Sequence, residues 1–260
     1  MALQDRIASA FAPATSALFA FADPQCGESA LDVGCGCGAT ALELAHRVGP
    51  NAGVVGIDIS RAMLAVAAQR AQALRLANIR FINADAATHA FGEPPCDLLF
   101  SQFGVMFFDD PARAFENLRR AVRDGGRVAF ACWRGLRENP WFAVPLDAGT
   151  PLLPPQPPGP AHAPGPLSFA DPAYVRGILS GARFADVALT AADIRLPLGP
   201  RAQAVDFLTQ MGPLTRRLAG AEPAVRDAVL RAVDGALRQH ETAGAVELGG
   251  GIWLVSARAA

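Results

Sequence analysis

The sequence predicts an α/β fold built on a doubly wound, mostly parallel sheet, and two observations support this. Short apolar segments alternate over residues 23–133 with segments whose apolar residues recur at helical spacing. In addition, a glycine-rich turn, "VGCGCGA", directly follows the first of these apolar segments. Strands that alternate with helices form β-α-β units, whose parallel sheet is covered by helices on both faces.

The elements of this half are expected in the following order. An N-terminal helix is predicted over 2–22, which Pro13 can divide into two pieces. Five strands are expected at 30–34, 53–60, 79–85, 96–103 and 127–133. Three helices are expected between them, at 39–48, 61–76 and 110–122. Ser60 can cap the second of these helices, Asp110-Pro111 can open the third, and Asp124-Gly125-Gly126 predicts a turn.

The pattern changes after Trp133. The Pro-rich segment 152–166 cannot form a regular helix or an inner strand. Further elements are expected as a helix at 171–182, a strand at 186–196, a helical block at 201–241 that breaks near Gly212-Pro213, and a last strand at 251–259.

We therefore expect one domain over residues 1–260, in which 23–133 form the half that holds a cofactor. The segments at about 134–168 and 200–245 are expected to be insertions. Their positions would let them cap the carboxyl edge of the sheet, where open α/β sheets bind ligands.

The composition is that of a folded protein without a strongly basic surface. Hydrophobic residues make up 51% of the 260 residues, and the formal net charge is −1. Proteins dedicated to nucleic acids normally carry a basic patch, so we expect no nucleic-acid partner. All 23 basic residues are arginine. The missing lysine excludes a Walker A loop and a Schiff-base enzyme that uses pyridoxal phosphate.

The five cysteines indicate no metal site. They contain no C-x-x-C pair, and Cys35 with Cys37 supply too few ligands for a structural zinc ion. We expect reduced, partly buried thiols, as in the cytoplasm. The N-terminus lacks the basic start of a signal peptide, and no apolar run reaches the length of a membrane span. These features predict a cytoplasmic protein with no membrane span.

The glycine-rich turn by itself allows two kinds of cofactor. Gly34, Gly36 and Ala39 satisfy the dinucleotide fingerprint, and Asp58 at the end of the second strand is the acid expected for a ribose diol. Asp32, however, lies two residues before the first glycine. A carboxylate there would be unfavourable beside a pyrophosphate and favourable beside a cationic amine or sulfonium.

A third acid, Asp85, ends the third strand and can accept a hydrogen bond from an exocyclic adenine amine. Three acids at three consecutive strand ends favour a ligand with an amine, a ribose diol and an adenine, and without a phosphate. S-adenosylmethionine has this chemistry.

The motifs that carry these residues resemble those of a known family. The segments "LDVGCGCGATALELA", "VVGIDIS", "INADAATHAF", "CDLLFSQFGVMFF" and "LRRAVRDGGRVAFACW" are similar, in order, to those of the class I S-adenosylmethionine-dependent methyltransferases. The likeness covers about residues 28–133 and is strongest to the small-molecule branch that includes quinone-biosynthesis enzymes. Asp124 stands where many members have proline. The resemblance implies a Rossmann-like, seven-stranded sheet that ends in an antiparallel hairpin, with helical cap insertions.

The resemblance also implies roles by position. The glycines, with Gly38, would let the backbone pass close to the methionine part of the cofactor, and Asp32 would orient its amino group. Asp58 would hold the ribose between Ile59 and Met63, and Asp85 would read the adenine. The cofactor-binding residues expected from this placement are Asp32, Gly34, Cys35, Gly36, Asp58, Ile59, Met63, Asp85, Ala86, Ser101, Gln102 and Phe103.

The expected reaction is in-line transfer of a methyl group to a small, aromatic or apolar molecule. Contacts with this acceptor are expected from Met106, Phe107, Trp133, Arg134, Trp141 and Tyr174, together with Phe103, Asn139 and Phe142. The histidines His89, His162 and His240 are candidate bases, but no motif assigns a catalytic residue.

Two other functions stay open at this point, an oxidoreductase that binds a nicotinamide dinucleotide and a cofactor-binding module without turnover. A small-molecule acceptor is the expected partner, and a homodimer is compatible with the sequence.

Overall fold

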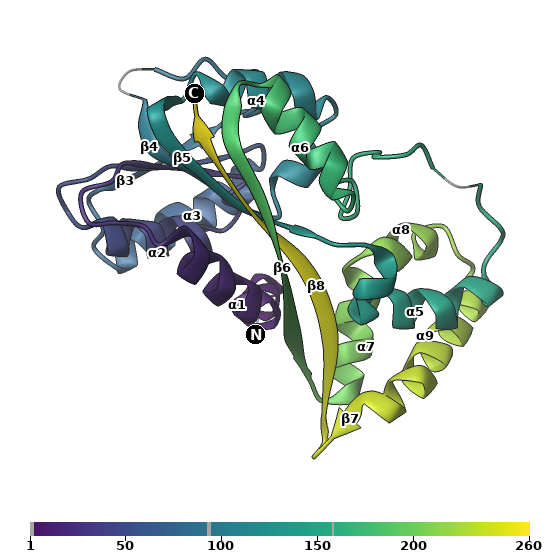
Figure 1. Ribbon diagram of the computed structural model, residues 1–260. Helices are drawn as coiled ribbons and strands as arrows, with labels where there is room; N and C mark the ends of the chain where they lie inside the picture. The colour runs from purple at the N-terminus through teal and green to yellow at the C-terminus, as the bar shows by residue number, and fades with distance from the viewer. Residues whose placement is uncertain (1–2, 93–94, 158) are drawn as a thin grey trace.

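The computed structural model describes residues 3–92, 95–157 and 159–260 (Figure 1). Its centre is one mixed sheet in the order β3-β2-β1-β4-β5-β8-β6, with a two-residue strand, β7, paired to β8. The strands are β1 (Ala30–Val33), β2 (Val54–Asp58), β3 (Ile79–Asn83), β4 (Cys96–Gln102), β5 (Val122–Trp133), β6 (Phe184–Gly199), β7 (Glu241–Thr242) and β8 (Ala245–Ala259). Strands β1 to β5 pair in parallel, whereas β8 is antiparallel to both of its main neighbours. The predicted doubly wound sheet with a C-terminal antiparallel hairpin is confirmed, and the two-residue β7 adds an eighth strand to the seven expected.

Helices cover both faces of this sheet. One face is covered by α1 (Leu3–Ala22), α2 (Ala39–Val48) and α3 (Arg61–Ala73), and the other by α4 (Pro111–Arg119) and α6 (Pro172–Gly181) (Figure 1). The caps are those that the sequence predicts, since Ser60 accepts a hydrogen bond from the Met63 amide and Asp110 from the Arg113 amide. Strands β1 and β4 lie side by side at the point where the strand order reverses, which is where such sheets bind ligands.

Several expected boundaries change for reasons of packing. Helix α1 runs without a break through Pro13. The expected turn at Asp124-Gly125-Gly126 is a bulge inside β5, because pairing with β4 passes from Cys96–Val122 directly to Leu98–Arg127. Strands β6 and β8 are longer than expected, since they pair with each other from Phe184–Ala259 to Gly199–Val246.

A second group of helices lies beside the end of the β6–β8 pair where β6 finishes and β8 begins (Figure 1). It contains α5 (Pro140–Gly149), α7 (Arg201–Gln210), α8 (Pro213–Leu218) and α9 (Pro223–Leu237). Its members come from the two expected insertions and pack against one another. Short 3₁₀ helices are η1 (Val105–Phe107), η2 (Leu136–Glu138), η3 (Thr150–Leu152) and η4 (Arg238–His240).

The Pro-rich chain links the two helical groups. Apart from the end of η3, it forms no helix or strand over 152–157 and 159–166, and it runs as a long connection between α5 and α6 (Figure 1). Among the described helices, none is long and apolar enough to cross a bilayer.

Candidate functional site

The glycine turn after β1 is held by backbone contacts. Gly34 has a φ of 71° and donates its amide to the Ile57 carbonyl at 2.9 Å. A Cβ atom on Gly34 would lie 2.8 Å from the Cα of Gly104, which follows β4. The turns after β1 and β4 therefore touch backbone to backbone, and a side chain at Gly34 would force them apart.

Asp58 is the last residue of β2, and Asp85 follows the last residue of β3 by two, so both lie close to the predicted strand ends. The Asp58 carboxylate accepts the Gly36 amide at 2.9 Å and the Ser60 amide at 2.8 Å. It thereby ties the glycine turn to β2, and each of its oxygens keeps a second lone pair. The exposed Asp85 accepts the Ala87 amide at 2.8 Å.

Asp32 is fully buried beneath the glycine turn. One of its oxygens accepts the Thr40 hydroxyl at 2.6 Å. The other, Oδ1, is buried without a hydrogen-bond partner in the described chain, as is Oε1 of Gln102. Burial raises the pKa of Asp32 from 3.8 to about 7, and the neighbouring Asp58 adds to this effect. Two unsatisfied oxygen acceptors beside a glycine turn fit the ammonium group of a ligand.

A cleft of about 980 Å³ opens at the carboxyl ends of these strands. Three large apolar side chains that line this cleft are exposed to solvent. Ile59 is 76% exposed, and Met63 and Phe107 are also exposed. A group of exposed apolar side chains at one cleft indicates a ligand-binding surface. The predicted cofactor residues that line this cleft are Gly34, Gly36, Asp58, Ile59, Met63, Asp85, Ala86, Gln102 and Phe103. The structure thus brings most of the expected cofactor set into one cleft.

Three predicted cofactor residues lie outside this cleft. Asp32 is beneath it, as described above. Ser101 is fully buried and donates its hydroxyl to the Val33 carbonyl at 2.7 Å, so it does not line the cleft as expected of a cofactor-binding residue. Cys35 borders a smaller cavity of about 400 Å³ under α1, while its thiol packs against Gly56. The Cys35 thiol therefore fills the space that a side chain at Gly56 would occupy.

An apolar cavity of about 800 Å³ adjoins the cleft. Phe103 stacks on Trp133 with ring centroids 4.2 Å apart, and Trp133 contacts Trp141 at 4.8 Å. Phe103 also has a φ of 63°, a conformation that is uncommon outside glycine and is found at functional sites. Its side chain borders the cleft, the small cavity under α1 and this apolar cavity. The three spaces therefore meet at Phe103.

Four of the predicted acceptor contacts, with Phe103 and Phe142, line this apolar cavity. They are Met106, Phe107, Trp133 and Trp141. Tyr174 does not line it but stacks on His162, which does, with ring centroids 3.8 Å apart. The expectation for Tyr174 is therefore wrong at the level of direct contact.

Arg134 and Asn139 were expected to contact the acceptor, but neither lines the apolar cavity, because both side chains bond elsewhere. Arg134 pairs with Asp193 at 2.8 Å and with Glu138, and its guanidinium lies over the Trp253 ring, so its charge is used outside the cavity. Asn139 is buried and bonds both backbone groups of Gly251, which fixes the start of α5 to β8.

The three candidate histidines separate in space. Of these three histidines, His162 alone is among the described residues that border the apolar cavity. Its Nδ1 lies 3.2 Å from the Ser168 carbonyl oxygen. Because a carbonyl oxygen only accepts, this contact is a hydrogen bond when Nδ1 carries the proton. His240 follows α9 in η4, away from the residues that line the cleft.

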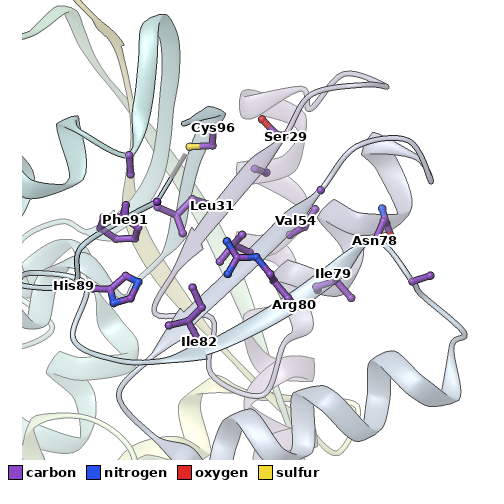
Figure 2. Close-up of a pocket in the computed structure, with 16 residues that line it drawn as sticks. Ser29, Leu31, Val54, Asn78, Ile79, Arg80, Ile82, His89, Phe91 and Cys96 are labelled. Atoms are coloured by element: carbon purple, nitrogen blue, oxygen red, sulfur yellow. The ribbon is translucent and has the colours of Figure 1, made fainter. Parts of the chain in front are cut away.

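His89 belongs to a different cavity, of about 570 Å³, on one face of β1 to β3 (Figure 2). The chain between β3 and β4 forms no helix in its described part, so His89 and Phe91 stand over this face beside Arg80 and Ile82. The acids at the strand ends do not line this cavity.

Two contributions to the site were missed in the sequence. Helix α1 lies over the glycine turn, where Ile7 and Phe11 border the small cavity. Helix α8 lines the apolar cavity with Thr215, Arg216 and Arg217. The apolar residues Ile7 and Phe11 recur at helical spacing, but nothing local shows which surface they cover.

Comparisons with known proteins agree with this geometry. The family described as "Methyltransferase domain" matches residues 30–126. The chain is 35% identical over 147 residues to aklanonic acid methyltransferase DauC of Streptomyces sp. (strain C5), which covers 56% of this chain and 62% of that protein. It is 30% identical over 244 residues to nocamycin O-methyltransferase of Saccharothrix syringae, covering 86% of each.

Similarity in structure extends over nearly the whole chain. A crystal structure of a putative methyltransferase from Bacillus halodurans C-125 superposes with a TM-score of 0.61 at 16% identity, covering 94% of this chain and 98% of the other, which shows a shared fold. The alignment with DauC spans less than two thirds of that relative, whereas the alignment with the nocamycin enzyme spans most of it. On the strength of this near full-length similarity and the ordered motifs, the chain belongs to the family of class I S-adenosylmethionine-dependent methyltransferases.

Proposed function

We propose that this chain methylates a small aromatic or apolar molecule with S-adenosylmethionine. The observation that carries the proposal is the meeting of the acid-lined cleft and the apolar cavity at Phe103. A transferase needs such a junction, because donor and acceptor must be held in contact and in line.

The cofactor would be held by oxygen acceptors that are unsatisfied in the structure or that keep free lone pairs. Asp32 Oδ1 and Gln102 Oε1 would accept the ammonium hydrogens. Asp58 would accept the two ribose hydroxyls, and the carboxylate of Asp85 would accept the adenine amine. The exposed Ile59 and Met63 would cover the adenine and thereby leave water. The backbone of Gly34 and Gly36 would lie against the methionine part, and the Ala86 amide at the adenine edge.

When bound, S-adenosylmethionine supplies a methyl group on a sulfonium, which is transferred without a further cofactor. The chain contributes placement and the exclusion of water. Phe103 and Trp133 form a rigid stacked wall at the junction, and Phe11 from α1 packs edge-on against Phe103 at 5.6 Å. Holding two reactants in this way can lower a barrier by ~7–11 kcal/mol.

The two insertions would form the cap that selects the acceptor. Trp141 and Phe142 come from the first insertion, and Met211 and Thr215 come from the second. Residues 23–133 would form the cofactor-binding half of this single domain. We also propose a cytoplasmic location, because all five cysteines are free thiols, as expected in a reducing compartment.

The proposal is tested by calorimetric titration with S-adenosylmethionine and S-adenosylhomocysteine, followed by assay of methyl transfer to a panel of aromatic hydroxy and carboxy compounds. We expect both cofactor forms to bind, and at least one acceptor to yield S-adenosylhomocysteine. Failure of both cofactor forms to bind the folded protein would contradict the proposed function.

Cofactor affinity should depend on pH through Asp32. The ammonium of the ligand favours the ionised carboxylate, whereas the pKa near 7 in the ligand-free protein favours the protonated form below neutrality. Binding of S-adenosylhomocysteine should therefore weaken by up to about tenfold per pH unit below pH 7. Calorimetry between pH 5.5 and 8.5 measures this, and an equally steep slope in Asp32→Asn would contradict it.

The same group should give the ligand-free protein an unusual stability profile. The folded-state pKa of Asp32 lies above its unfolded value of 3.8, so the folded protein binds the proton more tightly. The contribution of Asp32 to stability is then greatest below pH 3.8, and it is lost as the pH rises to about 7, by up to about 4 kcal/mol. Urea denaturation of the wild type and Asp32→Asn at pH 5 and 8 isolates this contribution.

A further inference from the structure

We propose that the cavity beside Arg80, on one face of β1 to β3, is a second binding site for an aliphatic carboxylate, a ligand with an alkyl chain and one carboxylate group. Arg80 would bind the carboxylate, and the apolar floor of the cavity would bind the chain. This cavity shares no described lining residue with the cofactor cleft or the acceptor cavity. The proposal therefore goes beyond the proposed function and does not depend on it.

The cavity exists because this part of the sheet lacks a covering helix. Parallel sheets normally carry helices on both faces. On this side of the sheet α4 packs farther along, where the ring of Phe115 lies 5.8 Å from that of Phe130 in β5 and 6.4 Å from that of Phe184 in β6. The described chain between β3 and β4 lies over β1 to β3 instead (Figure 2). The remaining space, about 570 Å³, is within the ~300–1,000 Å³ range of small-molecule sites.

The floor of the cavity is a row of side chains that the strand register brings to one face. Leu31 pairs with Val55, and Val55 pairs with Arg80, so these three side chains point the same way from neighbouring strands. Ile82 lies two residues beyond Arg80 and shares this face. Gly53 leaves the floor open, because a Cβ placed on it would have no heavy atom within 4 Å beyond its chain neighbours. An alkyl chain on this floor would leave water.

Arg80 supplies a positive charge that has no counter-ion in the described chain. It stands on β3, the edge strand of the sheet, from which an arginine can turn outward into water. Figure 2 shows instead that its side chain lies inward across the face, toward Leu31 and His89. It forms no ion pair or side-chain hydrogen bond with another described residue. Asp97, at the start of β4, is already paired with Arg123.

The wall formed by His89 and Phe91 is held in place from α4. Asn117 donates its side-chain amide to the carbonyls of Ala86 and His89 at 3.1 and 2.9 Å. The ring of His89 packs edge-on against that of Phe91, with centroids 5.0 Å apart. Since α4 holds the wall and the sheet holds the floor, the cavity is formed before a ligand binds. Binding would then require little ordering of the chain.

One negative charge on an aliphatic body is the chemistry that this cavity complements. Its described lining contains no aspartate or glutamate, so a cationic ligand would meet the charge of Arg80 without an acid to balance its own. A carboxylate brings one charge, and its two oxygens match the paired N–H donors of a guanidinium. The side chains of Leu31, Val55 and Ile82 are branched and aliphatic, which suits an alkyl chain.

The test titrates octanoate and octan-1-ol, which have the same number of carbon atoms, into the full chain by calorimetry without S-adenosylhomocysteine. We expect octanoate to bind about tenfold more tightly than octan-1-ol, the scale of a hydrogen bond to a charged group. Arg80→Gln should remove this preference, because the amide is polar but carries no charge. Arg231→Gln, at an exposed position of α9, is the matched control and should keep it.

Gly53→Leu tests the location separately from the charge. The new side chain would enter the open floor while Arg80 stays, so octanoate should bind about tenfold more weakly. This variant also keeps the test valid if Arg80→Gln unfolds. Unchanged octanoate affinity in either folded variant would overturn the inference, since the probe would then occupy another cavity. Equal affinity of the wild type for both probes would overturn it as well.

Sedimentation of the same samples tests the other occupant of such a face, a second copy of this chain. We expect the wild type and Gly53→Leu to have the same oligomeric state. A wild-type dimer that Gly53→Leu dissociates would show that a partner covers the cavity, and this would overturn the inference. Failure of S-adenosylhomocysteine to bind would contradict only the proposed function, because these titrations are made without it.

Discussion

Replacing Asp58 with alanine is expected to weaken the binding of S-adenosylhomocysteine by about 100-fold or more. Its carboxylate would lose two bonds to ribose hydroxyls, and bonds to a charged group contribute ~1.5–3 kcal/mol each. The same change leaves the amides of Gly36 and Ser60 without their acceptor, so the glycine turn also loses its tie to β2. Both effects lower the affinity for the cofactor, the first by removing direct bonds and the second by loosening the turn that contacts it.

Isothermal titration of folded protein measures this effect, with Asp227→Ala on the exposed face of α9 as the control. The affinity of Asp58→Asn should lie between those of Asp58→Ala and the control, because an amide oxygen still accepts hydrogen bonds but carries no charge. Wild-type affinity in Asp58→Ala would contradict the assignment of this carboxylate to the ribose.

The largest effect on stability is expected from Gly34→Ala. The new Cβ would lie 2.8 Å from the Cα of Gly104, and a φ of 71° is unfavourable for alanine. A left-handed backbone costs ~1–2 kcal/mol, and forced displacement of packed atoms costs ~1–3 kcal/mol more. The turns after β1 and β4 would separate, so we expect both lower stability and loss of cofactor binding.

Gly36→Ala is the informative comparison, because it shares the backbone penalty but not the backbone clash. Its φ is 53°, and its Cβ would meet the Cε atom of Met63 at 2.9 Å, the mobile end of a flexible side chain. Urea denaturation should therefore show a loss of only ~1–2 kcal/mol for Gly36→Ala. Equal losses in the two variants would show that the contact with Gly104 does not matter.

Much of the fold could be predicted because its signals are local. The helix at 39–48 has the expected bounds, Asp58 ends its strand, and Asp32 and Asp85 lie within two residues of the ends of theirs. Strand lengths were less predictable at β6 and β8. Their outer halves are stabilised by pairing with each other, as at Leu196–Leu248, and no periodicity within either segment reports such a partner.

The candidate site divides in the same way. Asp58, Asp85 and the glycines follow from their positions at strand ends, since parallel strands end at one edge of the sheet. The function of Arg134 could not be predicted, because Asp193, which pairs with it, lies 59 residues away in the chain. Ser101 was expected among the cofactor-binding residues, but its hydroxyl donates to the carbonyl of Val33, in a strand 68 residues earlier.

The sequence by itself determined the order of strands and helices, the family and the chemistry of the cofactor cleft. Those properties depend on periodicity and on residue types at strand ends, which are local. Only the tertiary structure decided that α1 covers the glycine turn, that Phe103 joins three cavities, and that α8 lines the apolar cavity with Thr215 and Arg217. Those contacts join residues far apart in the chain, and burial and the satisfaction of hydrogen bonds in the folded protein select them.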